Sequence, residues 1–86
     1  MINNTIEKVT DRIPLKERNE FQSFLIEITI GKKASLEDKL EWAIKNGKLV
    51  SDIIDNTQNE NIRSLIMVGK YKEASELVLV ILNEIN

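Results

Sequence analysis

The chain has 86 residues, 42% of them apolar, and a formal net charge of -2, which predicts one small domain without a charge excess that would attract a polyanion. It contains no cysteine and no histidine, so disulfide bonds, thiolate chemistry, Cys/His zinc sites and imidazole catalysis are excluded. The start has no basic cluster followed by an apolar stretch, and no apolar run is long enough to span a bilayer. We therefore expect an intracellular, cytoplasmic protein without membrane insertion.

The first third of the chain predicts two helices separated at Pro14. Proline disfavours helical conformation at the preceding residue and fits the first turn of a following helix. The second helix is expected from Leu15 to Ile30. Its expected inner face carries Phe21, Phe24, Leu25 and Ile28, whereas Ile26 and Ile30 point elsewhere. The first helix is marked by an apolar stripe at helical spacing, formed by Ile2, Ile6, Val9 and Ile13.

Each glycine precedes a lysine, and each such pair follows a stretch with helical apolar spacing. Glycine just past a helix and a basic residue near its negative end are stop signals. The pairs therefore predict three helix ends, at Gly31-Lys32, Gly47-Lys48 and Gly69-Lys70.

The middle of the chain predicts a third and a fourth helix. Ser35 and Asp38 have the spacing of a capping box, so the third helix is expected to begin there and to end at Gly47. The expected buried face of the third helix carries Leu36, Leu40, Ala43 and Ile44. A short fourth helix is expected to bury Leu49, Val50, Ile53 and Ile54.

The last third predicts a polar loop over residues 56–61, then a fifth and a sixth helix. Thr57 and Glu60 repeat the capping-box spacing before the fifth helix, which carries Ile62, Leu65 and Ile66. The sixth helix, Tyr71 to Ile85, is apolar nearly all round, so we expect it at the centre of the domain or in a subunit interface. Its main face is expected to carry Tyr71, Ala74, Val78, Ile81, Leu82 and Ile85.

The run Gly69-Lys70-Tyr71-Lys72-Glu73-Ala74 resembles the turn and second-helix opening of a tetratricopeptide repeat. The first-helix signature of that family is absent, so the resemblance implies only a tight antiparallel helical hairpin. Residues 1–86 are thus expected to form one all-α domain of five or six short helices, bundle-like, with this hairpin at its C-terminal end. The competing fold is α+β, with strands at Phe24–Ile30 and Leu77–Leu82.

No pattern indicates an enzyme, a metal site or a cofactor. The acidic pairs at i,i+3 spacing, such as Asp52 and Asp55, are typical of solvated helix faces. Ala43, Gly47 and Ile53 have the spacing of a DNA-binding helix-turn-helix, but the would-be recognition helix carries two carboxylates that oppose phosphate. We therefore prefer a plain helical hairpin there.

Four apolar side chains lie off the main seams of their helices and are predicted to form a partner or dimer interface: Trp42, Met67, Leu79 and Val80. We accordingly expect a non-enzymatic interaction module that forms a homodimer and regulates or inhibits a larger protein. The strong use of Ile, Asn and Lys is typical of AT-rich genomes and suggests a phage or low-GC bacterial source. The alternative is a nucleic-acid-binding regulator that uses lysines near helix junctions: Lys32, Lys33, Lys48, Lys70 and Lys72.

Overall fold

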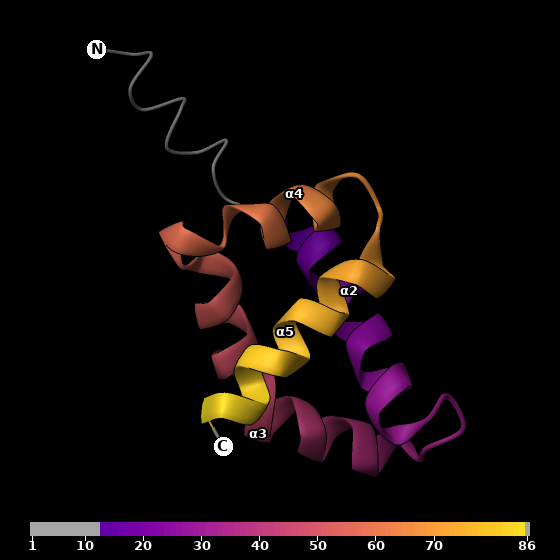
Figure 1. Ribbon diagram of the computed structural model, residues 1–86. Helices are drawn as coiled ribbons and strands as arrows, with labels where there is room; N and C mark the ends of the chain where they lie inside the picture. The colour runs from indigo at the N-terminus through magenta and orange to yellow at the C-terminus, as the bar shows by residue number, and fades with distance from the viewer. Residues whose placement is uncertain (1–12, 86) are drawn as a thin grey trace.

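The computed structural model describes residues 13–85, and this part of the chain is helical without strands (Figure 1). The predicted all-α class is confirmed. The α+β alternative is wrong, because both proposed strand segments lie inside helices. The first predicted helix lies outside the described residues, apart from Ile13. The elements in residues 13–85 are α2 (Leu15–Ile30), α3 (Leu36–Asp55), the 3₁₀ turn η1 (Thr57–Asn59), α4 (Glu60–Met67) and α5 (Tyr71–Ile85).

Helix α5 packs against α2, α3 and α4, and Figure 1 shows it lying across the other helices. The sequence predicts this central position from the apolar character of α5. Its buried residues are Ala74, Ser75, Val78 and Leu82. Ser75 was not expected among them; its hydroxyl donates to the carbonyl of Lys72 at 2.7 Å, which satisfies the buried polar group within the helix.

One apolar cluster joins the four helices. Phe21 and Leu25 of α2 are fully buried in it, as the sequence predicts. Ile28 was expected beside them but is 47% exposed, and Ile26 is buried instead because α3 packs on the Ile26 side of α2. The other buried apolar members are Ile13, Val50, Ile53, Ile54, Ile62, Ile66, Ala74, Val78 and Leu82.

Helix α3 is continuous through Gly47, so the predicted helix end at this glycine is wrong. The third and fourth predicted helices form one element of 20 residues. Glycine inside a helix costs roughly 1 kcal/mol relative to alanine, whereas burial of Val50, Ile53 and Ile54 beyond it stabilises the continued helix by more. The plain helical hairpin preferred at this point and the helix-turn-helix alternative are both wrong, since α3 has no turn there.

The buried face predicted for the first half of α3 is also wrong. Leu36, Leu40 and Ile44 are exposed, and Ala43 is half-buried. In this half Asn46 is turned inward and Trp42 packs at the edge of the core. In the second half the predicted burial of Val50, Ile53 and Ile54 is confirmed, and Leu49 packs at the edge. The exposed row and the inner row of residues both repeat at helical spacing. The inner row faces α2 and α5 because it continues into the apolar residues of the C-terminal half of α3.

The other two glycine stops are confirmed. Gly31 has φ 100° and Gly69 has φ 82°, a region that glycine enters without steric cost. After α4, the amide of Lys70 donates to the carbonyl of Leu65 at 2.8 Å and that of Gly69 to Ile66 at 3.0 Å, which is a Schellman motif. This turn leads directly into α5, which packs on α4; the antiparallel hairpin geometry and a total of five or six helices stay predictions.

One of the two predicted helix caps forms. The Ser35 hydroxyl accepts from the amide of Asp38 at 3.0 Å and caps α3. The expected cap by Thr57 is replaced by Asn56, whose side chain accepts from the amide of Gln58 at 2.9 Å and begins η1. Pro14 stands just before α2, where its carbonyl accepts from the amide of Arg18 at 3.0 Å.

Candidate functional site

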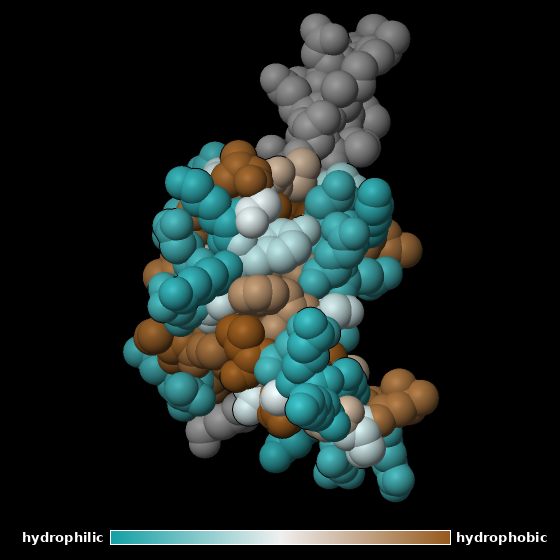
Figure 2. Space-filling view, turned by 90° about the vertical axis from the view of Figure 1, so that its right-hand side faces the viewer, coloured by the Kyte–Doolittle hydropathy of each residue, from teal (hydrophilic) through white to brown (hydrophobic). Residues whose placement is uncertain are grey.

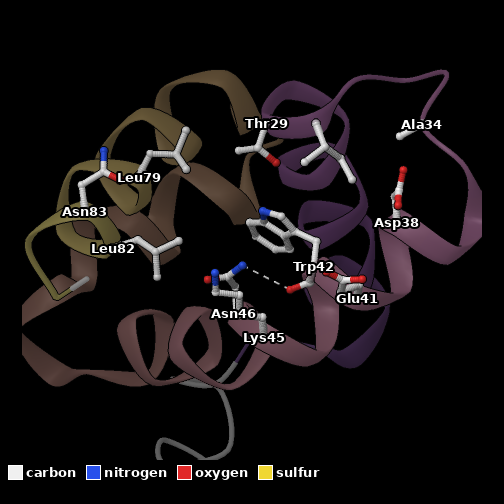
Figure 3. Close-up of a pocket in the computed structure, with 11 residues that line it drawn as sticks. Thr29, Ala34, Asp38, Glu41, Trp42, Lys45, Asn46, Leu79, Leu82 and Asn83 are labelled. Carbon is white, nitrogen blue, oxygen red and sulfur yellow. Dashed lines mark hydrogen bonds between the residues drawn. The ribbon is translucent and has the colours of Figure 1, made fainter.

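Two of the four predicted interface residues, Trp42 of α3 and Leu79 of α5, line the same cleft (Figure 3). The cleft has a volume of about 480 Å³ and lies where the end of α2, the first half of α3 and the end of α5 meet. Trp42 and Leu79 are both half-buried and rest on the core, and Leu82 is buried beside them. The floor of the cleft is therefore apolar.

Polar side chains surround this floor. Asp38, Glu41 and Lys45 come from the exposed side of α3, and Asn83 comes from the last turn of α5. The carboxylates and the ammonium group lie on one helix, so the rim carries both signs of charge. An apolar floor with a solvated polar rim is the composition of a surface that receives an apolar side chain from another molecule.

Local helical spacing holds Trp42 in place. Asn46 lies one turn later, is only 6% exposed, and donates from Nδ2 to the Trp42 carbonyl at 3.3 Å. This bond satisfies a polar group that burial would otherwise penalise. Within residues 13–85 no hydrogen-bond partner of the Trp42 indole N–H is found, and no buried side-chain polar atom is without a partner. The indole N–H is therefore open to a ligand or to water.

Met67 and Val80 do not line this cleft. Met67 ends α4 and Val80 lies on another side of α5 from Leu82, and both are more than half exposed. The four residues predicted as one interface thus divide into a cleft pair and two separate surface side chains.

The lysines of the alternative function are not brought together. Lys32 and Lys33 follow α2, whereas Lys70 and Lys72 lie at the start of α5, and Figure 1 shows these two connections at opposite ends of the molecule. Lys48 lies in the middle of α3 instead of at a helix junction. Binding to nucleic acid stays a prediction, and these positions do not provide a joined basic surface for it.

The pKa of Tyr71 is perturbed, and this residue lies outside the cleft. Burial raises the pKa of the Tyr71 hydroxyl, and the nearby negative charge of Glu20, which accepts a hydrogen bond from it at 3.5 Å, raises it further. The Tyr71 ring also contacts Phe21 edge-on, with centroids 5.8 Å apart. The hydroxyl is thus held protonated where the start of α5 meets α2, and the ring packs against the core.

Of the residues that line the cleft, the sequence prediction named Trp42 and Leu79 but not Thr29, Ile30, Asn46 and Leu82. Asn46 and Leu82 lie within one turn of the two predicted residues, so helical spacing was a usable signal for them. Thr29 and Ile30 come from α2, and only the packing of α2 against α3 brings them there.

In residues 13–85 no group of three or more acidic side chains has the arrangement of a metal site. None of the helices in this range is long and apolar enough to cross a membrane. No protein-family model, no curated protein and no solved structure matches this chain.

Proposed function

We propose that the protein is a non-enzymatic interaction module that binds another protein through the Trp42 cleft. The observation that carries this proposal is the pairing of Trp42 and Leu79 over one apolar floor that is open to solvent. Tryptophan provides a large contact area and an N–H donor, which is why it is frequent at the energetic centres of interfaces.

The size and the polarity of the cleft indicate which side chains of the bound protein it can accept. Its volume of about 480 Å³ admits one or two apolar side chains, and its floor offers no nucleophile or general base. The rim residues Glu41, Lys45 and Asn83 are placed to contact polar groups flanking those side chains. We further propose that the bound protein is larger than this chain and is regulated or inhibited by the contact, in the cytoplasm of a phage-infected or low-GC bacterial cell.

The sole tryptophan gives a direct readout of this site. Because the chain has one tryptophan, its emission reports on the cleft alone. Affinity capture from the source cell identifies the bound protein, and titration of the purified partner should shift Trp42 emission toward shorter wavelengths as water leaves the cleft. The same titration with Lys45→Glu, a change at an exposed rim position, should weaken binding without loss of helical circular dichroism.

The matched control is Ile44→Glu, which alters an exposed neighbour that does not line the cleft. It should leave the affinity for the captured protein unchanged. If Leu79→Ala and Lys45→Glu both keep the fold and bind the partner as the original chain does, the cleft is not the binding site.

A further inference from the structure

A second apolar surface runs along α3, on a different side from the Trp42 cleft. Leu36, Leu40 and Ile44 are spaced one turn apart and are 74%, 55% and 84% exposed. We call these three residues the α3 ridge. Figure 2 shows apolar side chains protruding among hydrophilic ones at the lower end of the molecule, the end that carries the connection from α2 to α3 in Figure 1. Large apolar side chains aligned on one exposed helix face are typical of interaction surfaces.

A hollow lies directly beside the ridge. It has a volume of about 250 Å³ and is formed between α2 and α3, with Ile26 and Ala43 among the residues that line it. Leu36 and Leu40 border the same hollow, whereas Ile44, the most exposed ridge residue, does not. The apolar surface of the ridge therefore extends into a space of side-chain size on the side of α2.

The charges beside the ridge are also self-complementary. Glu37 and Lys48 are eleven positions apart, about three helical turns, so they lie on the same flank of the ridge and have opposite charge. When two copies of a helix pair antiparallel about a two-fold axis, each flank of one helix lies beside the same flank of the other. An axis near residues 42 and 43 places Glu37 opposite Lys48 of the second copy, and the same register places Ile44 beside Leu40 of the second copy.

We propose that two copies of this chain associate through their α3 ridges, antiparallel about a two-fold axis between residues 42 and 43. The proposal is independent of the Trp42 cleft, because Trp42 and the ridge lie on different sides of α3. It gives the expected homodimer an interface that excludes Leu79 and Val80. One and the same antiparallel alignment brings the apolar ridge residues together and pairs Glu37 with Lys48. This favours a second copy of the chain over an unrelated protein as the molecule that covers the ridge.

Sedimentation equilibrium of the full chain tests this association. The expected mass at micromolar concentration is twice 9.9 kDa. Ile44→Glu should raise the dimer dissociation constant at least about tenfold, because it places a charge in the apolar interface. Val80→Glu is the matched control, since Val80 is 59% exposed on α5, and it should leave the mass unchanged. Circular dichroism checks that both variants stay folded.

Charge exchange tests the register. Glu37→Lys and Lys48→Glu should each weaken the dimer at low salt, and the double variant should restore it. A monomeric original chain, or a dimer that survives Ile44→Glu but dissociates with Val80→Glu, overturns the proposal. A photo-crosslinker at position 40 that joins only a different protein also overturns it. Neither result affects partner capture by the cleft, so the two proposals fail separately.

Discussion

The guanidinium of Arg18 donates two hydrogen bonds to the carboxylate of Asp55, of 2.8 and 3.2 Å. This bidentate contact joins the start of α2 to the end of α3. The Arg18 side chain is 13% exposed and that of Asp55 37%, so water partly screens the pair. Two parallel N–H bonds fix the orientation of the two helices more firmly than one charge contact would.

Arg18→Gln is expected to lower the free energy of unfolding by about 1 kcal/mol, the upper range for a partly exposed ion pair with good geometry. The loss should shrink with added salt. Urea unfolding measures it, and Lys16→Gln in the same exposed turn of α2 should change the stability little. A double-mutant cycle with Asp55→Asn isolates the pair; a coupling energy near zero would show that the bidentate contact contributes nothing.

Substitution by alanine should raise the stability of the protein at one glycine and lower it at the other two. Gly47 lies inside α3, and an added Cβ would be 3.6 Å from Oε1 of Gln22, an ordinary van der Waals contact. Gly47→Ala should therefore stabilise the protein by about 0.5–1 kcal/mol. At Gly31 and Gly69 the positive φ strains any other residue, so alanine should destabilise by about 1 kcal/mol at each site.

Thermal unfolding of the three single variants checks this contrast. If Gly47→Ala lowered the melting temperature as Gly31→Ala does, α3 would be interrupted at Gly47 after all.

Alanine substitutions at the two predicted capping residues, Ser35 and Thr57, should also differ in their effect on stability. Ser35 accepts the amide of Asp38 at the start of α3, so Ser35→Ala should cost about 1 kcal/mol. Thr57 is exposed within η1, whose cap is Asn56, so Thr57→Ala should be close to neutral and Asn56→Ala should cost more. Equal losses for Ser35→Ala and Thr57→Ala in urea unfolding would contradict this assignment of caps.

The helix positions were predictable from the sequence where strong local signals agreed. Pro14, the capping Ser35 and the two glycines with positive φ set the bounds of α2, the start of α3 and the turn before α5. These signals act through backbone geometry within a few residues, so they do not depend on tertiary contacts.

The inner face of the first half of α3 was not predictable in this way. Leu36, Leu40 and Ile44 form a cleaner apolar stripe than the true inner face, which includes the polar Asn46. The Trp42 carbonyl one turn earlier in α3 satisfies the Asn46 side chain, so this polar residue can be buried where α2 and α5 pack on α3. The cleft itself was not predicted, because only the packing of α2, α3 and α5 brings Trp42 and Leu79 together.

Tyr71 predicts how stability depends on alkaline pH. The folded protein holds the hydroxyl proton more tightly than the unfolded chain does, because burial and the charge of Glu20 raise the pKa of Tyr71. This contribution to stability is complete below about pH 10, the unfolded pKa, and is lost as the pH rises through the higher folded pKa. Stability in urea should therefore fall above about pH 10.

Tyr71→Phe keeps the ring that contacts Phe21 and Phe24 but removes the ionising hydroxyl. Its stability should fall less steeply above about pH 10 than that of the original chain, while lysine titration is common to both. Since the chain has one tyrosine, the near-ultraviolet absorbance of tyrosinate follows this group alone and should show a raised midpoint. Glu20→Gln removes the charge and retains an acceptor, so it should bring that midpoint partway back toward 10. A midpoint that Glu20→Gln leaves in place would assign the whole rise to burial between α2 and α5.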